Sequence, residues 1–280
     1  MCEGGTDKRT AGPPPQSATI AEAGPLNETQ RYLRVTVDHG PFDYLPGQFA
    51  EVSVPGLGVA PVSIISSPTF QGGIELVVRR TGPAADAIQT LQVGDKVALR
   101  GPLGRGRYPV DRARGKHVVF ICSGVGQAAQ RSFIHYVLDH RADYGEVAIL
   151  VGAKGYDRCL LPGELEAYRT RSDIRFLETL DRPDPRWSGP VGVVTNLIPR
   201  VRDLLADAVV SVCGPPIMYK FVIMALADYD VPFDRIYLNL EHKIRCGVGE
   251  CGRCRIGRIQ CCVDGPVLTY ADLASVPEAF

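Results

Sequence analysis

Strand-like runs alternate with helical segments in the second half of this chain. The expected strands are 117–124, 146–153, 173–180 and 208–214, and the expected helices are 127–141, 160–170, 192–205 and 215–229. Strands that are apolar throughout and are joined by helices predict a parallel, doubly wound sheet covered on both faces. Ligands bind such sheets at the carboxyl ends of the strands. We therefore expect an α/β doubly wound domain over residues 113–235.

The preceding stretch has a different pattern, made of short runs rich in β-branched residues and bounded by Gly, Pro, Asp and Asn. These runs are 31–40, 49–56, 60–67, 73–80 and 96–101. Several short strands separated by turn residues are typical of a small antiparallel barrel or sandwich. We expect an antiparallel β-barrel over residues 27–112. Residues 1–26 are rich in Gly, Pro, Ala and Ser, which predicts a flexible N-terminal arm.

Five of the nine cysteines fall within RCGVGECGRCRIGRIQCC, at residues 245–262. They are Cys246, Cys251, Cys254, Cys261 and Cys262. The spacing C-x4-C-x2-C, followed by a fourth cysteine, resembles the plant-type pattern for a [2Fe-2S] cluster. A zinc staple with four thiolate ligands is the alternative, although zinc sites usually pair two short knuckles. We expect a small C-terminal lobe over residues 236–280 that holds one of these metal centres.

The charge balance disfavours nucleic acid and anionic membranes as partners. Lys plus Arg and Asp plus Glu each number 31, so no net field attracts nucleic acid or an anionic membrane surface. No apolar run reaches the roughly 18 residues that a membrane span requires, and the first residues lack a secretion signal. We expect a cytoplasmic protein that binds no nucleic acid. In a reducing compartment, clustered thiols favour metal binding or redox chemistry over disulfides.

Two strand-to-helix turns in the α/β region are candidate binding sites. Gly124-x-Gly126 ends the first apolar strand and can bring backbone N–H groups and a helix N-terminus against a pyrophosphate. A glycine-rich turn of this kind also occurs for packing alone. The second turn, Cys213-Gly214-Pro215, ends the last apolar strand. A buried thiol at such a position is commonly inert core.

The order of these segments resembles the ferredoxin-NADP reductase superfamily. A small barrel with APVSIISSP, VVRRTG and GPLGRGRYP is followed by GVG, by VCGPPIM and by the cysteine pattern that ends in VDGPV. The chain is most similar to the flavin and iron-sulfur electron-transfer subunits of that superfamily. These belong to cytosolic nickel-iron hydrogenases (the sulfhydrogenase gamma subunit), to anaerobic sulfite reductase and to dihydroorotate dehydrogenase. The resemblance spans residues 27–275.

The resemblance implies an FAD-binding barrel. The family motif R-x-Y-S-x-x-S runs here as A-P-V-S-I-I-S, so its Arg and Tyr are replaced, as in the hydrogenase and sulfite reductase branch. Ser63 is expected to contact the isoalloxazine edge and to serve as a catalytic residue. Arg79 is expected to hold the FAD pyrophosphate, because its forked guanidinium can contact a diphosphate twice. The residues implied to bind FAD are Pro61, Val62, Ser63, Ser66, Arg79, Thr81 and Gly82.

The resemblance also implies an NAD(P)-binding domain over residues 113–235 and a [2Fe-2S] lobe after it. Gly124 and Gly126 match the family's glycine-rich turn, in which Ala129 here replaces a proline. Cys213 is expected to face the nicotinamide as a second catalytic residue, with Gly214 and Pro215 beside it. The implied cluster ligands are Cys246, Cys251, Cys254 and Cys262, since Cys262 precedes V-D-G-P as the family's fourth ligand precedes D-G-P. Cys261 is then a packed thiol or a spare one.

The nucleotide preference depends on the loop after the second apolar strand. Lys154 and Arg158 lie there, where the 2′-phosphate of NADP is expected. No acidic residue closes that strand to select the NAD ribose. Asp157 is adjacent, however, and solvated loop charges are the alternative interpretation. We expect NADP or NAD as the nucleotide, with NADP preferred.

These sites together predict an electron relay. A nicotinamide delivers two electrons as a hydride, an iron-sulfur cluster accepts one at a time, and a flavin can exchange with both. We expect an NAD(P)H-dependent oxidoreductase subunit that passes electrons to a partner enzyme, with a nickel-iron hydrogenase as the expected partner. Sulfite reductase and dihydroorotate dehydrogenase are alternative partners. A zinc-stapled module that senses a nucleotide without catalysis is a more distant alternative.

Overall fold

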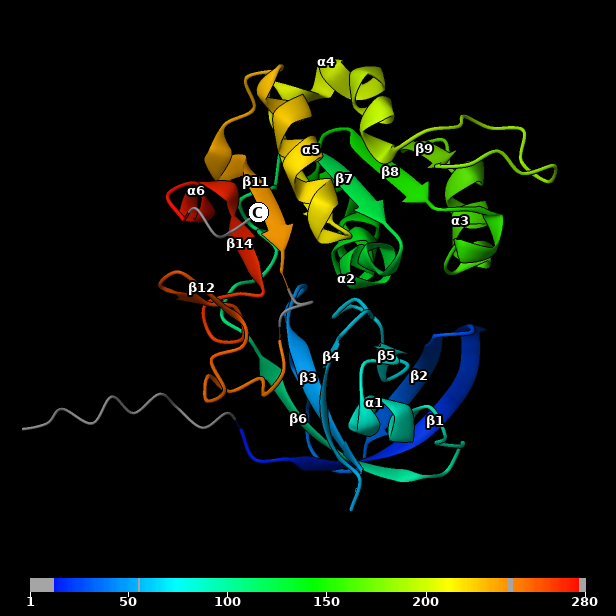
Figure 1. The fold of residues 1–280 in the computed structure, drawn as a ribbon, viewed down its shortest axis with the longest axis vertical. Coiled ribbons are helices and arrows are strands. Elements are labelled where there is room, and N and C mark those ends of the chain that lie inside the picture. The colour runs from blue at the N-terminus through cyan, green and yellow to red at the C-terminus, as the bar shows by residue number, and fades with distance from the viewer. Residues whose placement is uncertain (1–12, 55, 241–243, 277–280) are drawn as a thin grey trace, which may run out of the picture.

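The structure is a computed structural model, and it describes residues 13–54, 56–240 and 244–276. Two sheets form two bodies, with the N-terminal sheet below and the C-terminal sheet above in Figure 1. The first part of the expected arm, residues 1–12, lies outside the described residues.

The first sheet has six antiparallel strands in the order β4-β3-β6-β1-β2-β5. They are β1 (Gln16–Asn27), β2 (Gln30–Val37), β3 (Phe49–Val54), β4 (Gly58–Ser63), β5 (Ile74–Arg79) and β6 (Lys96–Leu103), with α1 (Pro83–Ile88) between the last two. The N–H of Ile65 donates to the Glu75 carbonyl at 2.9 Å, just beyond β4, so the two edge strands approach each other. The sheet therefore curls into the expected barrel-like form.

Strand β1 differs from the arm that we expected. It pairs with both β2 and β6, and its Ala18 and Ile20 side chains are buried in the barrel core. The prediction of an arm is therefore wrong from Gln16 onward. Only a short alternation of inward side chains marks this strand, and the surrounding Pro, Gly and Ser conceal it in the sequence.

The second sheet has the order β14-β11-β10-β7-β8-β9, and only β14 is antiparallel to its neighbour. Its strands are β7 (His117–Ser123), β8 (Val147–Ala153), β9 (Arg175–Leu180), β10 (Ala208–Cys213), β11 (Ile236–Asn239) and β14 (Val267–Thr269). Its helices are α2 (Val125–Asp139), α3 (Pro162–Thr170), α4 (Arg202–Leu205), α5 (Pro216–Ala227) and α6 (Tyr270–Leu273). The expected α/β doubly wound domain is confirmed.

Helices cover both faces of this sheet (Figure 1). Phe120 of β7 packs with Phe133 of α2, their ring centroids 5.2 Å apart, in a cluster that includes residues of α3. The next residue, Ile121, belongs to the cluster on the other face, with residues of α4 and α5. Successive strand residues point to opposite faces, so β7 is buried on both. No helix in the described part of the chain is long and apolar enough to cross a membrane.

The expected helix at 192–205 is only partly α-helical. Val194–Val201 forms a 3₁₀ helix, and α-helix follows only in α4. Pro199 lies inside the segment, where it lacks a backbone N–H and its ring clashes with the carbonyl one turn earlier in an α-helix. The helical segment was predicted at the right place, whereas its type was predicted wrongly.

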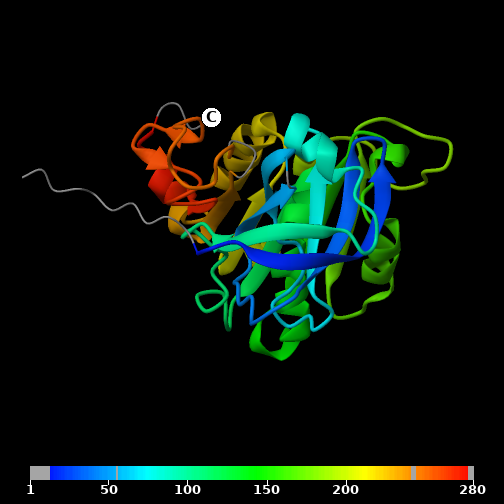
Figure 2. The same ribbon diagram turned by 90° about the horizontal axis from the view of Figure 1, so that it is seen from below.

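The C-terminal segment is less separate than expected. Strands β11 and β14 extend the α/β sheet, so a boundary at residue 236 cuts through that sheet. Between these strands, the cysteine loop (residues 244–262) contains only the short pair β12 (Arg255–Ile256) and β13 (Ile259–Gln260). Figures 1 and 2 both show this loop on one side of the molecule, with α3 on the opposite side. All four residues of β11 are buried, as in a continuing parallel strand.

Candidate functional site

A cavity of about 350 Å³ lies between the barrel and the α/β domain, and we call it the interdomain pocket. Strands β4 and β5 contribute one wall, and the start of α2 and the carboxyl end of β10 contribute the other. Nine predicted site residues line it: Pro61, Val62, Ser63, Arg79, Thr81, Gly82, Gly126, Cys213 and Gly214. The fold thus brings together residues that the sequence assigned to two separate sites.

The barrel wall is built from strand ends. Ser63 is paired in register with Phe49 of β3, and Phe49 itself lines the pocket. Arg79 ends β5 with an exposed side chain, and it makes no ion pair with any other described residue. A free guanidinium at the edge of a pocket is well suited to a phosphate or diphosphate.

The opposite wall depends on a close backbone approach at Gly126. A Cβ atom at this position would overlap the carbonyl group of Cys213 and lie 2.7 Å from the Gly214 nitrogen. Only glycine lets the first turn of α2 touch the end of β10 in this way. Gly124 has a different reason to be glycine, because its φ of 56° is in the left-handed region.

Tyr219 and Asn239 lie beneath this wall, and sequence analysis missed both. The Tyr219 hydroxyl donates to the Asn239 carbonyl at 2.5 Å, and the Gly214 N–H points to the same hydroxyl at 3.4 Å. Burial raises the pKa of Tyr219 well above its ordinary value, so the phenol stays neutral. The Cys213 sulfur lies 4.0 Å from the Asn239 carbonyl oxygen. In the sequence, Tyr219 is indistinguishable from a core aromatic of an apolar helix.

Among the residues predicted for the flavin motif and for the two strand-to-helix turns, three do not line the interdomain pocket: Ser66, Gly124 and Pro215. Ser66 is fully buried, and its hydroxyl accepts the Glu75 N–H at 3.0 Å and bonds the Tyr44 hydroxyl at 2.6 Å. Gly124 and Pro215 immediately precede the helices α2 and α5, next to residues that do line it.

Lys154 and Arg158 line a second cavity of about 800 Å³ beyond the carboxyl ends of β8 and β9. Arg182 also lines this cavity, and sequence analysis did not identify it. Asp157 is engaged by Arg186 at 2.8 Å, and the Arg186 guanidinium lies 4.5 Å from the centre of the Tyr156 ring. Asp157, which left the preference between NADP and NAD open, is therefore already paired with Arg186.

The cysteine loop directs backbone N–H groups toward sulfur atoms. The N–H of Gly249 points to the Cys262 sulfur at 3.2 Å, and the N–H of Cys251 points to the Cys246 sulfur at 3.4 Å. The N–H of Cys262 points to the Cys254 sulfur, also at 3.4 Å. Four glycines in the loop have positive φ, as the expected tight folding requires: Gly247, Gly249, Gly252 and Gly257.

The four predicted ligands differ in exposure and acidity. Cys251 is exposed, whereas Cys254 and Cys262 are buried. Burial opposes ionisation of Cys246, but backbone hydrogen bonds from Cys251 and its neighbours lower its pKa to about 7. Burial and the adjacent Cys254 thiol raise the pKa of Cys262 to about 12. Within the described residues, the side chains do not assemble three or more donors into one metal site, so the metal centre remains a prediction.

The cysteine loop contacts the barrel beside the interdomain pocket. Arg245 lines that pocket and donates to the Thr81 carbonyl at 3.3 Å. Two residues later, Gly247 packs so closely on Glu51 of β3 that a Cβ would lie 2.7 Å from its carboxylate oxygen. The predicted first ligand, Cys246, is thus held between two barrel contacts.

Comparisons with known proteins agree with this architecture. Residues 18–108 match the oxidoreductase FAD-binding domain, and residues 120–223 match the oxidoreductase NAD-binding domain. The gamma subunit of sulfhydrogenase 1 from Pyrococcus furiosus is 36% identical over 241 residues, which cover 84% of this chain and 82% of that protein. This chain belongs to the sulfhydrogenase gamma-subunit family. The family match confirms the resemblance, and the chain is an NAD(P)H-dependent flavin oxidoreductase.

Other relatives extend the family. A probable electron transfer subunit of dihydroorotate dehydrogenase B from Pyrococcus horikoshii is 30% identical, over 82% of this chain and 81% of that protein. Among solved structures, an NADH-dependent reduced ferredoxin-NADP oxidoreductase has a TM-score of 0.69 with 21% identity, covering 94% of this chain and 90% of that one. A Neisseria gonorrhoeae ferredoxin NADP+ reductase with bound FAD and NADP has a TM-score of 0.62 with 19% identity, covering 77% and 91%. These structures confirm the fold.

Proposed function

We propose that this chain is the electron-transfer subunit of a cytoplasmic redox complex and moves electrons between NAD(P)H and a partner enzyme through FAD and a [2Fe-2S] cluster. The observation that carries the proposal is the interdomain pocket, where nine residues predicted for FAD and nicotinamide share one cavity. Direct hydride transfer between a nicotinamide and a flavin requires that the two rings touch. A pocket formed by both domains supplies that meeting point.

The barrel wall suits FAD. Pro61, Val62 and Ser63 would border the flavin ring, and Arg79 would hold the diphosphate near Thr81 and Gly82. The Arg79 guanidinium at the pocket edge has no ion pair among the described residues, which supports this assignment, since a diphosphate offers it two acceptors. A bound FAD supplies the exchange between electron pairs and single electrons.

The α/β wall suits the nicotinamide. Gly126 lets the first turn of α2 pack on the end of β10, and Gly126 and Gly214 both line the pocket that a flat ring would enter. Tyr219 holds the turn from below through its bonds to Gly214 and Asn239. Cys213 then lines the pocket at the point where the nicotinamide would face the flavin. The roles of these residues are orientation and exclusion of water.

The donor set of the cysteine loop suits an iron-sulfur cluster. Backbone N–H groups aimed at sulfur stabilise the negative charge that cysteinate ligands carry. Cys246, Cys251, Cys254 and Cys262 would be the ligands. The Arg245 contact with Thr81 brings the start of this loop to the interdomain pocket, so the path from flavin to cluster would be short.

The proposed partner is a hydrogenase. Two sulfhydrogenase gamma subunits, at 36% and 34% identity, are more similar to this chain than the electron transfer subunit of dihydroorotate dehydrogenase B at 30%. The exposed Cys251 supports an electron exit at the surface of the loop. Purification from the native source with a nickel-iron enzyme attached would support this partner, whereas attachment to a dihydroorotate dehydrogenase would replace it.

An anaerobic visible spectrum of the purified chain, before and after addition of NADPH or NADH, tests the proposed function. Flavin and iron-sulfur bands that bleach with a nucleotide are expected. A colourless protein that contains zinc would contradict the relay and favour the nucleotide-sensing module, because neither zinc nor an adenine nucleotide absorbs visible light.

Replacing either Lys154 or Arg158 by alanine is expected to weaken the binding of NADPH more than the binding of NADH. Both side chains line the cavity beyond β8, and each charged contact with a 2′-phosphate contributes about 1.5–3 kcal/mol. The ratio of kcat/KM for NADPH over NADH should therefore fall about tenfold or more for each variant. Arg200→Ala removes an exposed charge elsewhere and should leave the ratio unchanged. Equal losses for both nucleotides would contradict this preference.

A further inference from the structure

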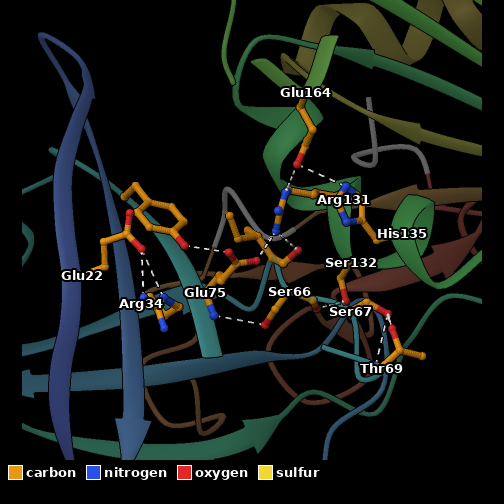
Figure 3. Close-up of polar contacts among 12 residues, drawn as sticks. Glu22, Arg34, Ser66, Ser67, Thr69, Glu75, Arg131, Ser132, His135 and Glu164 are labelled. Atoms are coloured by element: carbon orange, nitrogen blue, oxygen red, sulfur yellow. Dashed lines mark hydrogen bonds and ion pairs between the residues drawn. The ribbon is translucent and has the colours of Figure 1, made fainter. Parts of the chain in front are cut away.

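A buried group of charges joins the barrel to the α/β domain (Figure 3). Arg131 of α2 bonds Glu164 of α3 through Nε and Glu75 of β5 through Nη1. Their side chains are only 13%, 15% and 10% exposed, in that order. The Nη1 atom of Arg131 also donates to the Ile65 carbonyl at 3.2 Å. One guanidinium therefore contacts three segments from two domains.

The charged forms of Arg131 and Glu164 are favoured. Burial lowers the pKa of Arg131, but the charges of Glu164 and Glu75 outweigh it and raise that pKa. Burial raises the pKa of Glu164, but a hydrogen bond from His135 and the charge of Arg131 hold it below its ordinary value. A buried guanidinium with two carboxylates is strongly directional, because each bond fixes a distance and an angle.

Further bonds fasten the same helix to the same barrel segment. Ser132, next to Arg131, donates its hydroxyl to the Ser66 carbonyl at 2.6 Å. At the end of α2, Asp139 accepts from the Thr69 hydroxyl. On the barrel side, the Tyr32 hydroxyl donates to the second oxygen of Glu75 at 2.6 Å. Glu75 is thus held from both sides, and α2 is bonded along much of its length.

Apolar contacts between the two bodies at this place are few. The buried cluster here consists of Ile65, Val77 and Ala128, with Leu26 and Tyr32 packed against it. Apolar packing is not directional and allows small slides between surfaces. The directed bonds of Arg131 are therefore the stronger constraint on how α2 lies against β4 and β5.

We propose that Arg131 is a positioning residue for electron transfer between the two walls of the interdomain pocket. Helix α2 begins at that pocket with Val125 and Gly126, and β4 ends at it with Ser63. Arg131 bonds α2 to the segment that follows β4, so it sets how closely one wall approaches the other. The inference rests on the proposed assignment of these walls to the nicotinamide and the flavin.

Stopped-flow reduction of the flavin by saturating NADPH or NADH tests this role. In Arg131→Met, the flavin content and the nucleotide concentration for half-maximal rate should stay close to wild type. The rate at saturation should fall about 10- to 100-fold, because a displacement near 1 Å has effects of that size. Arg131→Lys keeps the positive charge but loses the forked guanidinium, so the reduction rate at saturating nucleotide should fall by less.

Arg169→Met is the matched control. Arg169 also bonds two carboxylates, those of Glu166 and Glu178, but all three residues belong to the α/β domain. Its loss should change thermal stability without changing the rate at saturation. If Arg131→Met does not fold, Glu75→Gln weakens the same contact with a smaller change and should slow the same step.

Three outcomes have different meanings. Wild-type rates in the Arg131 and Glu75 variants, or a loss confined to the half-maximal concentration, would overturn the positioning role. If Arg169→Met slows the reaction equally, Arg131 only stabilises the protein, and the positioning role would also be overturned. A wild-type protein that binds no flavin, or whose flavin does not bleach with either nucleotide, would instead overturn the proposed function.

Discussion

A methyl group added at Gly126 is expected to remove most of the reduction of the flavin by NAD(P)H. The new Cβ in Gly126→Ala would overlap the Cys213 backbone carbonyl group, and no rotamer change can relieve this contact because neither a Cβ nor a backbone carbonyl has a rotamer. The first turn of α2 must move, which costs about 1–3 kcal/mol of unfolding free energy. It also widens the wall where the nicotinamide is proposed to lie. The reduction rate should fall about 100-fold, measured by stopped flow at saturating nucleotide.

Gly163→Ala provides the control for this substitution. Gly163 lies in the first turn of α3 with an ordinary φ, and a Cβ there would meet nothing within 4 Å. Alanine should therefore stabilise the protein by about 0.5–1 kcal/mol and leave the reduction rate unchanged. A Gly126→Ala protein that reduces its flavin at the wild-type rate would show that the close approach at Cys213 has no part in the reaction.

Local sequence pattern was enough to predict most of the fold. Strands such as β7 and β10 are apolar on both faces, and the helices between them show one apolar side, so their periodicity identifies them. Prediction from local sequence pattern failed where tertiary contacts decide the structure. Gln16–Asn27 is a strand because β2 and β6 lie on either side of it, and Pro199 changes the type of helix without changing which side is buried.

The residues of the interdomain pocket were predicted from motif order, whereas their supports were not. Ser63, Arg79 and Cys213 stand in short motifs whose order along the chain is specific. Tyr219 supports its wall from inside an apolar helix, where nothing in the sequence separates it from ordinary core. Arg131 is the extreme case, because a charged residue on an amphipathic helix predicts a solvated face. Only the fold brings Glu75, 56 positions away, to neutralise it.

Contacts with the barrel connect the three proposed sites, which are those of the flavin, the nicotinamide and the cluster. Arg131 fixes the α/β wall of the interdomain pocket against the barrel wall, and Arg245 fixes the cysteine loop to the same barrel at Thr81. Both contacts end on backbone carbonyls of segments that flank the proposed flavin site. The wall proposed for the nicotinamide and the loop proposed for the cluster are therefore both held by contacts with the barrel. Distances that govern electron transfer would be set by contacts with the barrel.

Replacing Cys262 by serine is expected to abolish the iron-sulfur absorbance, while replacing Cys261 is expected to preserve it. The adjacent thiols are both buried, so exposure does not distinguish them. The family resemblance assigns the fourth ligand to Cys262, and in the structure the Gly249 N–H points to the Cys262 sulfur and the Cys262 N–H points to the Cys254 sulfur. Cys262 is thereby turned toward the loop that carries the other three predicted ligands. The visible spectrum and the iron content per chain measure the effect.

The paired variants also separate the cluster from the flavin. Loss of the cluster in Cys262→Ser should leave flavin bleaching by NAD(P)H intact, because the interdomain pocket contains none of the cysteine ligands. Reduction of a one-electron acceptor protein should fall sharply in the same variant. Retained iron in Cys262→Ser together with lost iron in Cys261→Ser would move the fourth ligand to Cys261. Zinc in place of iron in the wild type would instead make the loop a structural staple and leave the flavin without its proposed one-electron outlet.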